Sequence, residues 1–271
     1  MSQGPQGPGR LRTHRVATDT ACLTSRAINV HETSAWHELR SVAHAVYADP
    51  SRWSSEELER RAGPWLSADE RRHMNGLRND VVRHEFLATR ALCRGTLARI
   101  AGVFPGDWQF GTGAHGKPAV VTPTEFASLR FNLSHSDGMI VCLVSRAGEV
   151  GVDVERTRRP IDPESIAKHF FAPVERQQLA GLPSDHRALR SYQIWVLKEA
   201  YLKGCGAGLS RSPEEFAIDV PNEGETRSFE GWQLSLHRPS DDHIAATAIK
   251  PDDYRSAMVP VIWWPVDDDL L

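Results

Sequence analysis

The sequence has 271 residues, of which 40% are hydrophobic and 25% are charged, and its formal net charge is -3 at pH 7. This composition excludes a disordered or fibrous protein, and the length suffices for one large or two modest globular domains. The near-neutral charge argues against bulk binding to nucleic acid, which requires a strongly basic surface. The longest apolar run, Met139 to Val144, is far shorter than the roughly 20 residues that span a bilayer, so we expect no membrane segment.

The N-terminal residues 1–26 are rich in Gly, Pro, Thr and Arg and show no periodic pattern, so we expect a mobile tail. The first 15 residues lack the apolar stretch of a secretory signal, which favours a cytoplasmic protein. Cysteines stand far apart, at Cys22, Cys93, Cys142 and Cys205. This spacing argues against a disulfide framework and against a cysteine-based zinc site.

The first half is dominated by a helical pattern from Ser67 to Arg99, with Ser67 as a candidate N-terminal cap. At 100° per residue, Arg83, Arg90 and Arg94 fall close together beside the apolar stripe of this predicted helix. Two interpretations stay open for these arginines. They form either a solvated border of an amphipathic helix or a stripe that faces an anionic ligand.

After Pro105 the pattern changes to short β-like runs separated by Gly and Pro, at residues 108–110, 119–121, 129–133, 139–144 and 150–155. A helix is predicted from Asp162 up to Pro173, another from about Arg187 to Lys203, and a hairpin follows at 232–236 and 244–249. We therefore expect an α+β protein with an N-terminal half at 27–147, a C-terminal half at 148–255 and a C-terminal tail at 256–271.

The predicted strand Val150–Glu155 carries the strongest chemical signal. Its valines alternate with Gly151, Asp153 and Glu155, so one face is apolar and the other is acidic. Two carboxylates at i and i+2 lie about 6.5–7 Å apart on a strand, which is close enough to share a hard cation such as Mg²⁺. The alternative is a half-exposed strand with a solvated polar face.

The predicted helix Trp195–Lys203 places Glu199 and Lys203 on one face at i and i+4. Glycines follow directly, at Gly204, Gly206 and Gly208, and permit close approach of another backbone. The pair therefore indicates either a binding edge or a surface salt bridge of a few tenths of a kcal/mol.

Two weaker patterns precede these segments. In Asn132–Ser136 a histidine, His135, stands at the end of an apolar strand, where a structural or solvated histidine is the alternative to a functional one. In Gly116–Pro118 a tight loop holds Lys117, one of only five lysines in an arginine-rich chain, and a plain surface turn is the alternative.

Taken in order, these segments resemble the surfactin-type 4′-phosphopantetheinyl transferases over about residues 70–209; the matching motifs are Gly116–Pro118, Phe131–Ser136, Val150–Glu155, Phe170–Glu175 and Trp195–Leu209. The resemblance implies a monomer of two similar α+β halves related by pseudo-twofold symmetry, with coenzyme A in the cleft between them. It also implies a Mg²⁺-dependent reaction of the holo-acyl-carrier-protein synthase type. In that reaction 4′-phosphopantetheine passes from coenzyme A to a serine of an apo acyl or peptidyl carrier protein, and 3′,5′-ADP is released.

Position by position, the resemblance implies that Asp153, Glu155 and Glu199 bind Mg²⁺, with Mn²⁺ as the alternative ion. Asp153, Glu199 and Lys203 are the expected catalytic residues, with Glu199 as candidate base and Lys203 beside the transferred phosphate. The residues expected to bind coenzyme A are Lys117, Pro118, Ser134, His135, Arg83, Arg90, Lys198 and Lys203. The competing hypotheses are an inactive scaffold that binds carrier proteins and another Mg²⁺-dependent enzyme acting on the coenzyme A pyrophosphate. Nucleic acid and membranes are not expected partners, and the identity of the carrier stays open.

Overall fold

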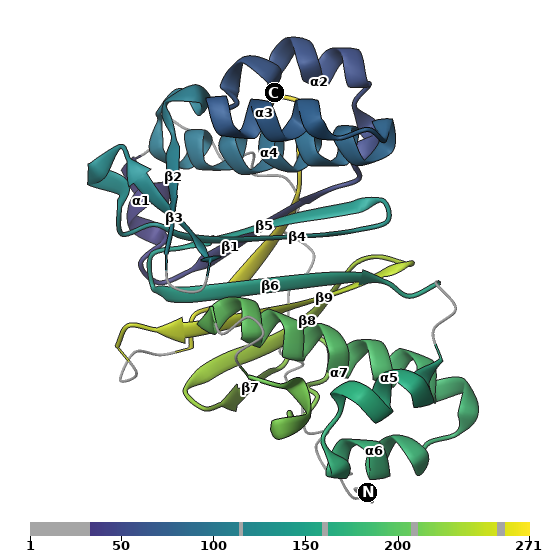
Figure 1. Ribbon diagram of the computed structural model, residues 1–271. Helices are drawn as coiled ribbons and strands as arrows, with labels where there is room; N and C mark the ends of the chain where they lie inside the picture. Colours follow the sequence, from purple (N-terminus) through teal and green to yellow (C-terminus); the bar gives the residue numbers. More distant parts are fainter. Residues whose placement is uncertain (1–32, 114–115, 159–161, 207–210, 254–257) are drawn as a thin grey trace, which may run out of the picture.

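Two four-stranded sheets lie against each other in the centre of the molecule (Figure 1). The computed structural model describes residues 33–113, 116–158, 162–206, 211–253 and 258–271. The first sheet has the order β10-β1-β5-β4, with strands β1 (Ala43–Ala48), β4 (Arg130–Ser136), β5 (Met139–Ser145) and β10 (Val261–Pro265). The second has the order β6-β9-β8-β7, with strands β6 (Gly148–Arg156), β7 (Thr226–Phe229), β8 (Trp232–Ser240) and β9 (His243–Pro251). A small separate ribbon pairs β2 (Gln109–Thr112) with β3 (Pro118–Thr122).

One long helix covers the outer face of each sheet (Figure 1). On the first sheet this is α4 (Asp80–Ala101), accompanied by α1 (Thr33–Glu38), α2 (Ser55–Arg61) and α3 (Ala68–Gly76). On the second it is α7 (Ser184–Cys205), accompanied by α5 (Pro163–Phe170) and α6 (Pro173–Ala180). Short 3-10 turns occur at Pro50–Arg52, Gly63–Trp65, Pro105–Asp107, Thr124–Phe126 and Pro213–Glu215. No helix in the described ranges is long and apolar enough to cross a bilayer.

Three apolar layers hold this arrangement together. One lies between α4 and the first sheet, and another lies between α7 and the second sheet. The third lies between the two sheets, where Val150, Val152 and Val154 of β6 pack against β1 and β5. The alternation predicted for β6 is therefore confirmed on its apolar side, because the three valines are buried together. The mixed α+β class is confirmed as well, whereas the symmetry between the halves stays a prediction.

The predicted helix over Ser67–Arg99 is wrong in one respect, because the chain forms two helices there. Ser67 and Glu70 make a reciprocal capping box that starts α3. The side chain of Asn79 then accepts hydrogen bonds from the backbone N–H groups of Val81 and Val82 and so caps the start of α4. A second cap inside one helical pattern satisfies backbone donors locally, and this makes a break there favourable.

The C-terminal segment expected as a tail over 256–271 instead supplies a strand of the first sheet in the part that the structure describes, residues 258–271. Its strand β10 pairs in parallel with β1, and Val266 and Leu270 beyond it are buried in the core under α4. The indole of Trp264 donates a hydrogen bond to Nδ1 of His44 at 3.0 Å. Apolar and aromatic side chains thus anchor the chain end in the N-terminal half. The predicted tail at 1–26 lies outside the described residues.

Candidate active site

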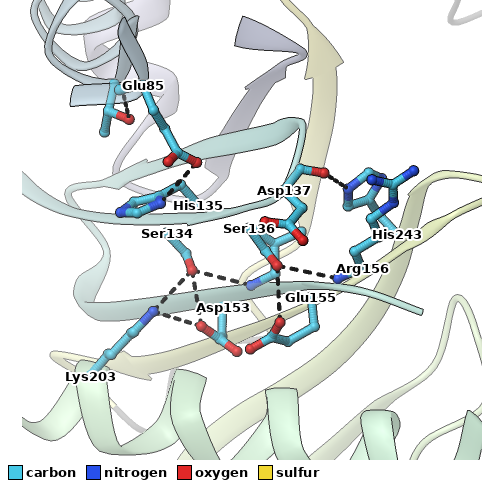
Figure 2. Close-up of polar contacts among 12 residues, drawn as sticks. Glu85, Ser134, His135, Ser136, Asp137, Asp153, Glu155, Arg156, Lys203 and His243 are labelled. Atoms are coloured by element: carbon cyan, nitrogen blue, oxygen red, sulfur yellow. Dashed lines mark hydrogen bonds and ion pairs between the residues drawn. The ribbon is translucent and has the colours of Figure 1, made fainter. Parts of the chain in front are cut away.

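The acidic face of β6 points towards α7, opposite to the valines (Figure 2). Asp153 is only 4% exposed, so the alternative of a solvated polar face is wrong for this residue. Glu155 lies two residues further on the same face and is partly buried. Strand periodicity therefore places two carboxylates side by side in a region with little access to water.

The helix α7 crosses β6 in direct backbone contact. A Cβ atom added at Gly151 would lie 2.0 Å from the carbonyl oxygen of Ala200 and 2.4 Å from the amide nitrogen of Gly204. No residue with a Cβ atom fits at position 151, because Cβ atoms do not approach backbone atoms so closely. The close crossing brings the α7 residues Glu199 and Lys203 beside the acidic face of β6.

A three-membered polar cluster forms at this crossing (Figure 2). The Lys203 ammonium donates to Oδ1 of Asp153 at 2.6 Å and to the Ser134 hydroxyl at 2.9 Å. That hydroxyl donates in turn to Oδ1 of Asp153 at 2.9 Å. Glu199 and Lys203 were expected either to line a site or to form a surface salt bridge with each other, but the salt-bridge partner of Lys203 is Asp153.

The edge strands β4 and β6 are joined by side chains. Polar side chains at alternate positions of β4 accept hydrogen bonds from backbone N–H groups of β6. The pairs are Asn132–Val152 (2.9 Å), Ser134–Val154 (3.3 Å) and Ser136–Arg156 (3.4 Å). Asn132 and Ser136 were not predicted as parts of the site. Their spacing of two, with Ser134 between them, was a signal for one polar face of a strand.

Glu155 is held by two hydrogen bonds. The hydroxyl of Ser136 donates to its Oε2 at 3.0 Å, and the indole N–H of Trp195 donates to its Oε1 at 3.2 Å. Trp195 stands four residues before Glu199 on α7, so both face the same way. Trp195 belongs to the motif expected on this helix, but its contact with Glu155 was not predicted.

The electrostatics of the site favour a bound cation. Burial raises the pKa of Asp153, although Lys203 and Ser134 act in the opposite direction. Burial followed by repulsion from Asp153 raises the pKa of Glu155, and the same two causes, opposed by Lys203, raise the pKa of Glu199. Because burial is the largest cause of all three shifts, the charged forms of these carboxylates are destabilised chiefly by loss of water, and a cation beside them would offset that cost.

The donor set also fits a divalent metal ion. Oδ2 of Asp153 is buried and has no hydrogen-bond partner among the described residues, which leaves an oxygen available to a ligand. Three carboxylates supply the oxygen ligands that Mg²⁺ prefers. Within the described ranges no three His, Cys, Asp or Glu side chains lie in coordination geometry, and the cation that Asp153 contacts is the Lys203 ammonium.

A cavity of about 660 Å³ opens beside this cluster. Four of the predicted site residues line it, namely Lys117, Pro118, Glu199 and Lys203. Asn132 and Trp195 also line this cavity, so residues from both halves of the chain surround it. Lys117 does not point freely into solvent, because its ammonium contacts Glu149 at 2.6 Å and the Gly204 carbonyl at 2.8 Å.

His135 lies on β4 and faces α4 (Figure 2). Its Nδ1 is 3.1 Å from Oε1 of Glu85, and its side chain is 56% exposed. The structure therefore brings His135 next to the arginine-bearing helix α4 and leaves much of the imidazole accessible.

The three arginines of α4 differ in their surroundings. Arg83 pairs with Asp80 on the same helix, and Arg90 lies 3.5 Å from Glu70; both remain partly exposed. Arg94 is 1% exposed and donates to Glu70 at 2.6 Å and to the carbonyls of Pro105 and Trp108. The interpretation of Arg94 as part of an anion-facing stripe is therefore wrong, because its charge and donors are used inside the fold.

Lys198 is placed differently from its neighbour Glu199. Its side chain is fully buried and pairs with Glu175 at 2.8 Å. This placement argues against the expected contact of Lys198 with coenzyme A. A sequence signal existed, since Ile194, Tyr201 and Leu202 at i-4, i+3 and i+4 are apolar.

Fold and site together define an α+β protein with a buried carboxylate and lysine site suited to phosphate chemistry. Residues 149–259 match the sequence profile of the 4′-phosphopantetheinyl transferase superfamily. The chain is 34% identical over 185 residues to the 4′-phosphopantetheinyl transferase HetI of Nostoc sp., covering 68% of this chain and 78% of that relative. It is 28% identical over 182 residues to the 4′-phosphopantetheinyl transferase Sfp of Bacillus subtilis, covering 67% and 78%. The chain belongs to the 4′-phosphopantetheinyl transferase superfamily, and the resemblance drawn from its motifs is confirmed.

Proposed function

We propose that this chain transfers 4′-phosphopantetheine from coenzyme A to a serine of an apo acyl or peptidyl carrier protein. In this reaction the serine oxygen bonds to the β-phosphorus of the pyrophosphate, and the bond from that phosphorus to 3′,5′-ADP breaks. The observation that carries the proposal is the cluster of Asp153, Glu155 and Glu199 with Lys203 beside a cavity large enough for part of such a ligand. The names of the relatives support the same reaction.

Glu199 is the proposed base for the serine proton. It lines the cavity, and burial together with Asp153 raises its pKa above the usual value for a glutamate. A carboxylate with a raised pKa accepts a proton more readily, and positioning supplies much of the remaining acceleration. The proton that leaves the serine would then reside on the Glu199 carboxylate.

The proposed metal ligands are Asp153, Glu155 and Glu199, with Mg²⁺ as the expected ion and Mn²⁺ as the alternative. When bound, the ion would act as a Lewis acid that neutralises charge on the pyrophosphate oxygens. The fixed hydrogen bonds from Ser136 and Trp195 orient Glu155 before any ligand arrives. Such supporting contacts keep ligand side chains in one orientation.

The residues that we propose to bind the nucleotide end of coenzyme A are Ser134, His135, Lys117, Pro118, Arg83 and Arg90. Guanidinium and imidazolium groups match phosphate oxygens through charge-assisted hydrogen bonds. Lys117 and Pro118 line the cavity, and His135 offers an accessible imidazole. Cytoplasmic location, a monomeric state and a reaction of the holo-acyl-carrier-protein synthase type complete this proposal.

The direct test is intact-mass spectrometry of an apo acyl carrier and an apo peptidyl carrier incubated with this protein, coenzyme A and Mg²⁺. We expect a phosphopantetheine adduct on at least one carrier and its loss when EDTA removes the metal. Carrier binding without any adduct would favour the inactive scaffold. Release of 3′,5′-ADP without a carrier would favour an enzyme that cleaves the coenzyme A pyrophosphate.

Replacing His135 by Ala is expected to raise the KM for coenzyme A about tenfold, because one charge-assisted hydrogen bond is lost. The KM for the carrier should stay near the wild-type value. Steady-state kinetics with each substrate varied in turn measure both constants. Glu85→Gln is the matched control, since it removes the negative charge that His135 contacts without removing the imidazole. An equal loss in both variants would contradict a direct phosphate contact by His135.

Replacing Lys203 by Met is expected to lower kcat by about 10²-fold, because one cation that stabilises charge on the transferred phosphate is lost. Single-turnover kinetics with saturating coenzyme A isolate this effect. Thermal unfolding of the variant should be recorded as well, since Asp153 loses its ion-pair partner. Lys203→Arg keeps the charge and is expected to retain more activity. A change confined to the KM for the carrier would refute the role in phosphate stabilisation.

A further inference from the structure

A buried ion pair lies directly behind the wall of the active-site cavity. Lys198 of α7 and Glu175 of α6 have side-chain exposures of 0% and 1%, and their charged atoms are 2.8 Å apart. Burial lowers the pKa of Lys198, and the Glu175 carboxylate counteracts this change. Two charges withdrawn from water are expensive unless every donor and acceptor is satisfied. The contacts of this pair show which part of the fold it supports.

Every hydrogen-bonding group of the pair is used. The Lys198 ammonium donates to Glu175, to the Pro213 carbonyl at 2.7 Å and to the Phe216 carbonyl at 2.5 Å. The Glu175 carboxylate also accepts hydrogen bonds from the backbone N–H groups of Ala172 at 2.8 Å and Ile218 at 2.9 Å. Three of these four backbone groups belong to residues 213–218. The pair thus attaches this segment to both α6 and α7.

The same segment begins at the cavity wall. Arg211, Ser212 and Pro213 line the cavity that Glu199 and Lys203 also line. Lys198 directly precedes Glu199 on α7. The proposed base and the lysine that holds residues 213–218 therefore lie on different sides of one helical turn. The distance between Glu199 and this wall therefore depends on the contacts of Lys198.

A second anchor lies close by on α7. Arg211 forms a two-pronged ion pair with Glu230 at 2.7 Å and 2.8 Å, and the Tyr201 hydroxyl donates to Glu230 at 2.7 Å. Tyr201 is three residues after Lys198, on the neighbouring side of the helix. The wall at residues 211–213 is consequently tied to α7 at two points, and Lys198 supplies the fully buried one.

We infer that Lys198 and Glu175 are positioning residues that hold the wall at Arg211–Pro213 against Glu199 and thereby set the affinity for the ligand of this cavity. Neither side chain contacts that ligand. The inference rests on the proposed function, which identifies the ligand as coenzyme A. It assigns Lys198 a part in the reaction that differs from direct binding, because the ammonium has no donor left for a phosphate.

The test compares Lys198→Met, Lys198→Met with Glu175→Gln, and the wild type. In both variants we expect the KM and the calorimetric Kd for coenzyme A to rise about tenfold, as is typical when a supporting contact is removed. The kcat at saturating coenzyme A should stay within about twofold, because Glu199 and Lys203 are retained. The double variant should recover part of the lost Tm, since it no longer buries an unpaired carboxylate.

The control is Leu58→Ala, which truncates a fully buried side chain of α2 in the other half. It should lower the Tm and leave the Kd for coenzyme A unchanged. If Lys198→Met likewise lowers only the Tm, the pair is merely structural and the inference is overturned. A double-mutant cycle with Arg211→Met should show non-additive losses, because both changes release one wall. Additive losses would instead indicate independent contacts with the ligand and would also overturn it.

Failure of the proposed function has a different signature. In that case the wild-type protein would neither bind coenzyme A in calorimetry nor modify either carrier. The inference about Lys198 is contradicted when the wild type does both and the variants either keep its Kd or lose affinity additively with Arg211→Met.

Discussion

Glu199→Gln is expected to lower the kcat of phosphopantetheinyl transfer by about 10³-fold or more while leaving the fold intact. The change removes a proposed metal ligand and the proposed base in one step, and each of these contributions is large. Stability should be retained or slightly raised, because burial and repulsion from Asp153 raise the pKa of the native carboxylate. A carboxylate whose pKa is raised in the folded state destabilises that state when the carboxylate is charged.

The measurement is single-turnover transfer to an apo carrier, together with thermal unfolding and calorimetric binding of Mn²⁺. Asp185→Asn is the matched control: it removes one negative charge from the same helix at a side chain that is 75% exposed. Partial rescue of Glu199→Gln by high Mg²⁺ would indicate a metal ligand alone, whereas no rescue supports the role as base. Near-normal turnover in Glu199→Gln would remove this residue from the site.

Gly151→Ala is expected to destabilise the protein by about 3 kcal/mol or more and to abolish most of the activity. The new Cβ would lie 2.0 Å from the Ala200 carbonyl oxygen and 2.6 Å from the Cα atom of Gly204. These are backbone atoms, so α7 as a whole must move away from β6. That movement separates Lys203 and Glu199 from Asp153, and both stability and chemistry suffer.

Thermal unfolding should show a Tm lowered by roughly 10 °C. Gly76→Ala is the control, because among the described residues no atom beyond the adjacent residues and the backbone of its own helix lies within 4 Å of the Cβ position there. That variant should keep the wild-type Tm and activity. A Gly151→Ala protein with an unchanged Tm would mean that the helix and strand are not in backbone contact, which contradicts the geometry of the site.

Local patterns predicted the elements that carry the site. The period-2 alternation of β6 placed Asp153 and Glu155 on one face, and this holds because strand geometry alone determines it. The glycines after Lys203 predicted the end of α7, where Gly206 adopts φ 65° as its C-terminal cap. Motif order pointed to the family that the comparisons establish.

Contacts distant in sequence were not predictable in this way. Arg94 and Arg83 share a face of the predicted helix, yet Arg94 is buried against Glu70 and two carbonyls, whereas Arg83 stays partly exposed. The end of the chain was expected as a tail, yet it supplies β10 because β1 offers it an unpaired edge more than 200 residues earlier in the sequence.

By itself, the sequence determined that this chain is an α+β protein with a carboxylate strand, a Glu199 and Lys203 helix face, and the motifs of the phosphopantetheinyl transferase family. Only the tertiary structure decided the partners of these groups: Lys203 with Asp153 and Ser134, Glu155 with Ser136 and Trp195, and Lys198 with Glu175. The physical reason is that periodicity defines the face on which a side chain lies. What that face meets depends on how the helices and sheets pack, and that packing joins residues far apart in the chain.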